Sequence, residues 1–377
     1  MADIADLYKG TGISKDQLSD DGEPCILYGE LYTKYKSETI KEVISKTNID
    51  NTKLVRSKAN DVIIPCSGET AEDIATARCV LNDNILLGGD LNIIRLHGYD
   101  GTFMSYQLNG KRKYDIAKVA QGVSVVHLYG EHLKGVKTIN PCLEEQKKIA
   151  SLLALLDERI ATQNKIIEDL KKLKSAISKL LFTRKDLLET TIRLADIATL
   201  KNGYAFQSSK YNTLGKWKIL TIANVFGERY INEEDCNCII NLPNDIQDHQ
   251  VLKEGDILIS LTGNVGRVSL CKAGNYLLNQ RVGLLHITKN VNQEFLYQVL
   301  SSRRFENSMV ACGQGAAQMN IGKGDVENFV LPYSSNANNI HLAAKILHSY
   351  DECIINELRE LTLRTMQKQY FLAQMFI

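Results

Sequence analysis

The chain contains two related copies of one unit. Residues 2–10 read Ala-Asp-Ile-Ala-Asp-Leu-Tyr-Lys-Gly, and residues 195–203 read Ala-Asp-Ile-Ala-Thr-Leu-Lys-Asn-Gly. Further along, residues 61–68 (Asp-Val-Ile-Ile-Pro-Cys-Ser-Gly) correspond to residues 256–263 (Asp-Ile-Leu-Ile-Ser-Leu-Thr-Gly). The two copies share these framework positions and differ between them. A chain of 377 residues has room for two domains of ordinary size with connecting helices.

Each copy ends in a long helical pattern, predicted over residues 144–182 and 340–376. No proline or glycine occurs between Pro141 and Phe182, and the uninterrupted pattern predicts a helix of roughly 55 Å. One domain core cannot cover such a length, so we expect the two helices to pair as an antiparallel coiled coil. Alternatively, each apolar stripe is only the core-facing side of a helix. The residues predicted to form the seam are Ile149, Leu152, Leu156, Ile166, Leu170, Leu173, Ile177, Leu180, Leu347, Ile354 and Leu361.

The segments before the helices contain short β-type runs bounded by turn residues, such as residues 62–64 and 282–287. They predict compact domains of the α/β (mixed α+β) class. The expected architecture is two globular domains separated by two long antiparallel helices, with a pseudo-two-fold internal repeat. The expected boundaries are residues 1–140, 141–185, 186–332 and 333–377.

Composition excludes several classes of protein. No apolar run approaches the roughly 18 residues of a membrane span, and the acidic N-terminus lacks the pattern of a secretion signal. Nine cysteines without a Cys-x-x-Cys pair indicate reduced thiols, so we expect a cytoplasmic protein. The net charge is only +1, which does not suit an autonomous, strongly basic nucleic-acid binder. Residues 146–185 are the basic exception, with 10 Lys+Arg against 4 Asp+Glu.

Catalytic motifs are missing from the sequence. The five prolines are never adjacent, so the Pro-Pro loop of DNA amino-methyltransferases is absent. No phosphate-binding Gly-x-x-x-x-Gly-Lys-Ser/Thr loop occurs, and the seven histidines show no metal-ligand spacing. We therefore expect no catalytic and no metal-binding residues. Two other readings stay open: a self-sufficient DNA methyltransferase or nuclease with a diverged active site, and a structural protein built on a coiled coil.

Several motifs together resemble a known family. Residues 141–157 follow the pattern Pro-x3-Glu-Gln-x2-Ile-Ala-x2-Leu-x2-Leu-Asp and lead into the helix that ends at residues 180–182 (Leu-Leu-Phe). The second copy has Gly-Asp-Ile-Leu-Ile-Ser-Leu-Thr-Gly-Asn-Val-Gly at 255–266, Leu-Asn-Gln at 278–280 and Gln-Gly-x2-Gln-x-Asn-Ile at 314–321. In this order they resemble the central conserved region and the target-recognition domain of type I restriction-modification specificity (S) subunits.

The resemblance implies a non-catalytic subunit that binds double-stranded DNA. Each target-recognition domain would read one half of a bipartite sequence, and the helix pair would set the spacing and dock methyltransferase (M) subunits. Restriction/translocase (R) subunits would be further partners. S-adenosylmethionine, ATP and Mg are expected on these partners, and no cofactor is expected in this chain. The first copy departs from the pattern, with Val125 and His127 where the second has Gln318 and Asn320.

Polar and basic residues near the shared glycine motifs and on the divergent loops are the candidates for DNA contact. Arg and Lys suit guanine edges, while Asn and Gln suit adenine edges. In the first domain the candidates are Lys9, Tyr32, Lys34, Ser67, Thr70, Lys111, Arg112, Lys113, Gln121 and Ser124. In the second they are Tyr204, Lys210, Lys216, Thr262, Asn264, Arg267, Arg281, Gln314 and Gln318. The basic residues of the first helix are either a solvated face or part of a docking surface.

Overall fold

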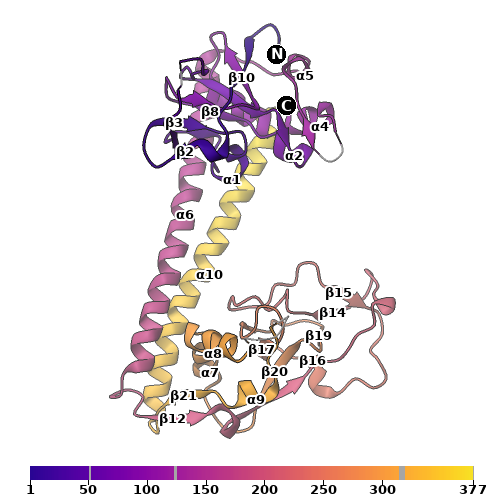
Figure 1. The fold of residues 1–377 in the computed structure, drawn as a ribbon. Helices are drawn as coiled ribbons and strands as arrows, with labels where there is room; N and C mark the ends of the chain where they lie inside the picture. The colour runs from indigo at the N-terminus through magenta and orange to yellow at the C-terminus, as the bar shows by residue number, and fades with distance from the viewer. Residues whose placement is uncertain (51, 123–124, 314–318, 377) are drawn as a thin grey trace. The chain divides into compact units, whose positions relative to one another are not determined.

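The structure is a computed structural model that describes residues 1–50, 52–122, 125–313 and 319–376. The chain divides into two compact units (Figure 1). Unit 1 comprises Met1–Lys165 with Arg359–Ile377, and unit 2 comprises Ile166–Leu358. Each unit therefore combines one globular domain with a part of both long helices. Within the described residues, no helix has the length and apolar character that crossing a bilayer requires.

The two long helices are α6 (Leu143–Thr183, 41 residues) and α10 (Ala337–Gln374, 38 residues). Both lie where the sequence predicts them. In unit 1, the start of α6 packs against the end of α10, with Ala150 and Leu153 in one apolar cluster with Phe376. In unit 2, the end of α6 shares a core with the start of α10. The helices therefore pair antiparallel, as expected.

The predicted seam of α6 differs from the structure at four positions. Leu152, Ile166, Leu173 and Leu180 are 38%, 41%, 47% and 60% exposed. Leu156, Leu347 and Ile354 are buried as expected, while Ile149, Leu170, Ile177 and Leu361 are half-buried.

The helix α6 carries a second stripe, and this one is buried. It runs through Gln146, Ala150, Leu153, Gln163 and Ile167 and ends near Leu181. Two of its members are glutamines, so the spacing of apolar residues alone favours the neighbouring stripe of leucines and isoleucines. Polar side chains can lie on the buried face of α6 because they have hydrogen-bond partners there. Gln146, for example, donates to the Pro141 carbonyl at 2.7 Å.

The main sheet of unit 1 has the strand order β1-β10-β6-β8-β4. All its pairs are antiparallel except that of β4 with β8. A second sheet has the order β2-β5-β3-β9, and β7 pairs with β11. The strands are β1 (Ala5–Lys9), β2 (Leu18–Ser19), β3 (Glu23–Ile26), β4 (Thr39–Ile40), β5 (Ser45–Thr47), β6 (Asp61–Pro65), β7 (Ser67–Gly68), β8 (Arg78–Val80), β9 (Leu86–Leu87), β10 (Leu91–Leu96) and β11 (Val126–His127).

Short helices cover the sheets of unit 1. They are η1 (Lys15–Gln17), α1 (Glu30–Thr33), α2 (Ala71–Ile74), α3 (Gly101–Asn109), α4 (Lys113–Val119) and α5 (Gly130–Lys134). The longest, α3, is capped by the Asp100 side chain, which accepts from the Phe103 N–H at 2.7 Å. Phe103 and Tyr106 on α3 pack into the cluster formed by the long helices. The helix α3 is thus one element that joins the globular domain of unit 1 to α6 and α10.

Unit 2 repeats this topology. Its main sheet has the order β13-β20-β17-β18, a second sheet has the order β15-β14-β19-β16, and β12 pairs with β21. The strands are β12 (Thr190–Arg193), β13 (Ala198–Asn202), β14 (Trp217–Leu220), β15 (Asn237–Ile239), β16 (Val251–Leu252), β17 (Ile257–Ser260), β18 (Val268–Leu270), β19 (Tyr276–Leu278), β20 (Val282–Ile287) and β21 (Val330–Tyr333). The helices are η2 (Leu194–Asp196), η3 (Ser208–Lys210), η4 (Asp248–Gln250), α7 (Gln293–Leu300), α8 (Arg303–Gly313) and α9 (Lys323–Glu327).

The strand registers confirm the internal repeat seen in the sequence. Ala5 faces Leu96 in the pair β1–β10, and Ala198 faces Ile287 in the pair β13–β20. Each second sheet also contains one parallel pair, β3 with β9 in unit 1 and β14 with β19 in unit 2. Among the described residues, α2 occurs in unit 1 without a helical counterpart in unit 2, and β4, which pairs parallel with β8, is reduced in unit 2 to the parallel bridge of Tyr230 with Leu270. The two domains therefore share a scaffold and differ in what is inserted into it.

Candidate nucleic-acid interface

In unit 2, three loops meet at one end of the main sheet. Leu261, directly after β17, donates its N–H to the carbonyl of Arg281 at 3.0 Å and accepts from the N–H of Ile321 at 2.9 Å. Gly263 donates to Met319 at 2.9 Å. We call this meeting point the unit 2 edge: the loop 261–267, residues 279–281 and residues 319–321. Main-chain hydrogen bonds fix all three segments, so side chains leaving them are held by a rigid support.

The loop 261–267 of the unit 2 edge has a conformation that glycine makes possible. Gly263 and Gly266 have φ values of +71° and +76°, which side-chain-bearing residues rarely adopt. A Cβ on Gly266 would also lie 2.6 Å from the Cβ of Met309. Between these glycines the side chain of Asn264 is exposed, as is that of Arg281 across the edge. Both are hydrogen-bonding groups of the kind that read base edges.

Of the other candidates of unit 2, Arg267 and Lys216 contact side chains of the protein, whereas the Thr262 hydroxyl has no hydrogen-bond partner among the described residues. The Oγ1 of Thr262 is buried. Arg267 lies 3.7 Å from Glu306, and the ammonium of Lys216 lies 5.7 Å from the ring centre of Trp217. These two cations are exposed or half-buried and remain within reach of a ligand.

A pocket of about 540 Å³ lies beside the unit 2 edge. Tyr204 forms one wall; its N–H donates to Leu278 at 2.8 Å, and its hydroxyl donates to Asp245 at 2.8 Å. The ring of Phe206 packs against that of Tyr204 at a tilt of 57°, with ring centres 4.9 Å apart, and Lys210 lines the same pocket. The hydrogen bond to Asp245 raises the pKa of Tyr204, so the phenol stays protonated at neutral pH. Two predicted residues, Tyr204 and Lys210, are thus brought together.

Unit 1 has a corresponding edge built from other residues. Gln121 and His127 exchange main-chain hydrogen bonds at 2.9 and 2.7 Å, next to the pairing of β7 with β11. The Oγ of Ser67 donates to Asp90 at 3.2 Å, and the ammonium of Lys9 lies 4.0 Å from the same carboxylate. These five residues form the unit 1 edge. The structure therefore brings together three of the predicted residues, Lys9, Ser67 and Gln121.

Aspartate and arginine occupy matching positions in the two edges. Asp90 directly precedes β10, and Arg281 comes directly before β20, which is the matching strand of the repeat. Ser67 in β7 corresponds to Thr262 in unit 2. Thr262 forms an antiparallel β-bridge with Asn320, just as β7 pairs antiparallel with β11. Opposite charges at equivalent points of one scaffold give the two edges different hydrogen-bonding surfaces.

The other candidates of unit 1 are not among the five residues that form this edge. Thr70 caps α2 by accepting from the Asp73 N–H at 3.1 Å, and Lys34 is paired with Glu30 at 2.6 Å. Both therefore have structural roles, which the sequence pattern alone did not reveal. The remaining members are Tyr32 on α1 and Lys111, Arg112 and Lys113 at the start of α4, with Arg112 paired to Asp115 at 3.4 Å. Ser124, Gln314 and Gln318 lie outside the described residues.

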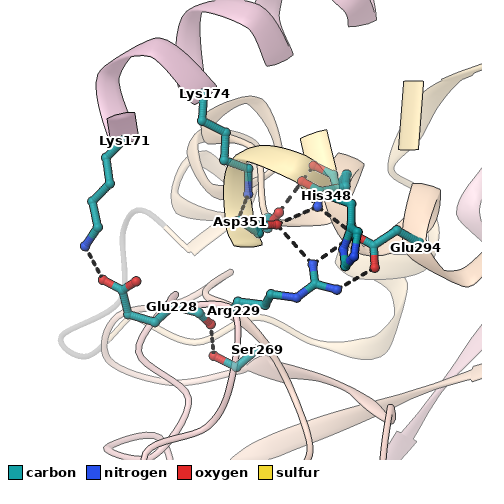
Figure 2. Close-up of polar contacts among 10 residues, drawn as sticks. Lys171, Lys174, Glu228, Arg229, Ser269, Glu294, His348 and Asp351 are labelled. Atoms are coloured by element: carbon teal, nitrogen blue, oxygen red, sulfur yellow. Dashed lines mark hydrogen bonds and ion pairs between the residues drawn. The ribbon is translucent and has the colours of Figure 1, made fainter. Parts of the chain in front are cut away.

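A buried ion cluster lies under the loops of unit 2 (Figure 2). Arg229 contacts Glu294 with both terminal nitrogens, at 2.8 and 2.6 Å, and Asp351 at 3.0 Å. Burial lowers the pKa of Arg229, but the hydrogen bonds and charge of Glu294 outweigh it, so that the pKa is raised. Burial raises the pKa of Glu294, and the bonds from Arg229 and Gln298 more than offset this, leaving it lowered. Both groups therefore stay charged.

Unit 1 has a buried ion cluster at the corresponding part of the helices. The ammonium of Lys368 on α10 lies 2.7 Å from Asp157 on α6 and 2.9 Å from Glu38. Tyr106 on α3 donates its hydroxyl to Asp157 at 2.5 Å. Burial raises the pKa of Glu38, although Lys368 opposes the shift. Neither cluster could be predicted from a sequence motif, although Asp157 and Asp351 recur at equivalent positions of the repeat.

In the part of the chain that the structure describes, no metal site accompanies these features. Among residues 1–50, 52–122, 125–313 and 319–376, no group of three or more His, Cys, Asp or Glu side chains is arranged to hold a metal ion.

Solved structures share this duplicated fold. The crystal structure of a type I restriction-modification S subunit from M. genitalium aligns with a TM-score of 0.63 at 18% identity, covering 100% of this chain and 94% of that one. A structure from a study of complex assembly and conformational transition in a type I R-M system aligns with a TM-score of 0.58 at 15% identity, covering 98% and 95%. At these identities the likeness is one of fold. The class that they define is therefore a fold, with two related mixed α/β domains and long helices.

Sequence comparison gives the family. The model of the type I restriction modification DNA specificity domain matches residues 1–172 and again residues 189–362. The chain therefore belongs to the type I restriction-modification specificity subunits, and the expectation of a non-catalytic subunit is confirmed by this membership. The specificity subunit of type I restriction enzyme MjaVIII from Methanocaldococcus jannaschii is 26% identical over 356 residues, covering 87% of this chain and 80% of the relative. The putative MjaX specificity subunit of the same organism is 25% identical, covering 77% and 75%.

Proposed function

We propose that the chain binds a bipartite DNA sequence, with the domain of each unit reading one half. The main support is that the two units carry equivalent edges. In each unit, main-chain hydrogen bonds hold a set of loops at the end of the main sheet, with Asp90 at the unit 1 edge and Arg281 at the equivalent position of the unit 2 edge. Two different hydrogen-bonding surfaces on one scaffold suit two different short sequences. The candidates nearest to the reading surfaces are Lys9, Ser67 and Gln121 in unit 1 and Tyr204, Asn264 and Arg281 in unit 2.

The charge distribution supports DNA binding as part of a complex. With a net charge of +1, this chain neutralises few phosphates by itself, and phosphate neutralisation supplies most of the non-specific affinity for DNA. We infer that partner subunits supply the rest. Tight binding is then expected only for the assembled complex, with a steep dependence on salt concentration.

The exposed stripe of α6 supports docking of M subunits. It comprises Leu152, Leu155, Ile166, Leu173 and Leu180, which are exposed in the described structure. Isolated apolar residues on a surface are ordinary, whereas a stripe of them along one helix is typical of a contact surface. The restriction/translocase subunits would join through this complex. S-adenosylmethionine, ATP and Mg would be bound by the partner subunits, and the helix pair would set the distance between the half-sites.

The experiment is methylome sequencing of cells that express this chain with its cognate M subunit. A split methylated motif with a fixed spacer is expected, and it should vanish when this chain is omitted. A continuous motif, or methylation by the M subunit alone, would contradict the proposal. The chain alone should neither methylate DNA nor bind S-adenosylmethionine; if it does, the reading as a self-sufficient methyltransferase is correct instead.

A further inference from the structure

One buried cluster joins four separate elements of unit 2. Arg229 lies in the loop between β14 and β15, Glu294 on α7, Asp351 on α10 and Lys174 on α6. Arg229 contacts both carboxylates, and Lys174 lies 2.5 Å from Asp351. Figure 2 shows these side chains converging from the loop and from the helices. The globular domain of unit 2 and its two helical segments therefore meet at one charged point.

The geometry of this cluster leaves Arg229 little freedom. Its side chain is only 8% exposed, and its guanidinium lies 5.0 Å from the ring centre of Tyr297. Gln298 donates to both Asp351, at 2.6 Å, and Glu294, at 2.7 Å, and so holds the two carboxylates. A two-pronged Arg–carboxylate contact is directional and fixes the partners in angle as well as in distance.

Stability alone does not account for such a cluster. Removing charges from water costs about as much as their attraction returns, so a buried ion network contributes little net stability compared with apolar residues of similar size. What it can supply is a single defined arrangement of the parts it joins. Glu228, the neighbour of Arg229, also reaches the helices, through Lys171 at 2.6 Å, but that pair is exposed, and exposed pairs contribute little.

Buried ion pairs also join the globular domain of unit 1 to its segments of α6 and α10. There Lys368 on α10 forms an ion pair with Asp157 on α6 and a second ion pair with Glu38 of the globular domain. The domain contributes an anion to the pair on the helices in unit 1, whereas in unit 2 it contributes Arg229, which is also paired with Glu294 of the same domain.

We propose that the cluster of Arg229, Glu294 and Asp351 is a positioning element that holds the second recognition domain at one angle on the helix pair, so that this domain meets its half-site at one spacing only. This inference rests on the proposed function. Arg229 acts through the orientation of the domain and contacts no base. Loss of the cluster relaxes the spacing requirement and leaves the sequence of the half-site unchanged.

The test uses the full chain assembled with its M subunit and duplexes that carry the methylated motif with the natural spacer or with one base pair more or less. The main variant is R229M/E294Q/D351N, which replaces the three charges of the cluster with neutral residues of similar size; Lys174, whose side chain is 17% exposed, then remains as a partly hydrated ammonium. R229K keeps the charge but loses the two-pronged contact. E228Q, which removes the exposed neighbouring pair, is the matched control. Binding of a duplex with only the second half-site is measured in parallel.

The wild type and E228Q should lose roughly tenfold or more in affinity when the spacer changes by one base pair, since one half of the contacts then falls out of register. The triple variant should lose less than about threefold, while it binds the isolated half-site as the wild type does; R229K should fall between. Unchanged spacer discrimination in the triple variant would overturn the inference and leave the proposed function intact. Loss of half-site binding would also overturn it, because the cluster would then support the fold of the reading loops. A wild type that shows no preference for the motif would refute the proposed function itself.

Discussion

Lys174 on α6 lies 2.5 Å from Asp351 on α10, and the same contact occurs again between Lys368 and Asp157 with the helices exchanged. Each residue of one pair is 194 positions from its counterpart, 157 from 351 and 174 from 368. The internal repeat therefore extends to the polar contacts between the helices. In each unit, a charged side chain of the globular domain contacts this pair and so links the domain to the helices: Glu38 in unit 1 and Arg229 in unit 2.

The pair in unit 1 should be essential for the stability of that unit. K368M leaves Asp157 and Glu38 largely buried beside each other without a cation, and the loss of one partner of such a network costs about 3–5 kcal/mol. Urea unfolding and hydrogen exchange of unit 1 measure the effect. The triple variant K368M/D157N/E38Q should recover most of the loss, and K345M, on an exposed position of α10, should have none. Equal stability of K368M and K345M would show that the cluster is well hydrated.

Arg281 should determine one position of the second half-site. Because its side chain is exposed at a rigid edge, R281A should weaken binding to the motif by about 1–3 kcal/mol and relax the preference for one base pair. Competition binding with duplexes substituted at each position of the half-site is the measurement. K289A changes an exposed charge of the same unit away from the edge and should lower affinity equally for all sequences or leave it unchanged. A uniform loss for R281A would mean that Arg281 contacts only phosphate.

Glu189 should give unit 2 an acid-sensitive contact. Its carboxylate accepts from the N–H and hydroxyl of Ser335, at 2.7 and 2.9 Å, and hydrogen bonds from its own backbone N–H, from Ser335 and from Ser334 lower its pKa from 4.5 to about 2. Because the folded-state pKa is depressed, this stabilisation is present above pH 4.5 and is lost as the pH falls toward 2. NMR titration should give the low pKa, and E189Q should remove this part of the pH dependence of unfolding. A carboxylate that titrates near 4.5 would contradict the contact.

The length of the helix pair should set the spacing of the half-sites. Inserting seven residues into each of α6 and α10 lengthens the pair by roughly 10 Å, which corresponds to about three base pairs at 3.4 Å each. Methylome sequencing of an active, folded insertion variant should show the longer spacer. An unchanged spacer would assign the distance to the partner subunits.

Much of the fold could be predicted from the sequence, because it depends on patterns that repeat. The duplicated motifs and the uninterrupted helical periodicity predicted two mixed α/β domains and two long antiparallel helices. The seam of α6 could not be predicted in full, since its buried side includes Gln146, whose hydrogen bond to the Pro141 carbonyl is made only in the folded chain. A count of apolar residues selected Leu152 and Leu173 instead, which are exposed.

The candidate site was predictable only where the shared motifs mark a turn. The glycines around Asn264 locate the unit 2 edge, but the role of Thr70 as a helix cap and the pairing of Lys34 with Glu30 depend on local geometry. Arg229 carries no sequence motif. Its importance arises from Glu294 and Asp351, which are 65 and 122 residues away in the chain.

Exchange of one domain tests the central claim most directly. Residues 195–332 would be replaced by the equivalent segment of a family member with a different target, and the methylated motif would be determined by methylome sequencing in cells that also express the M subunit. If each domain reads one half, the new motif keeps one half-site and the spacer and acquires the donor's other half-site. A change in both half-sites, or in neither, would contradict the account.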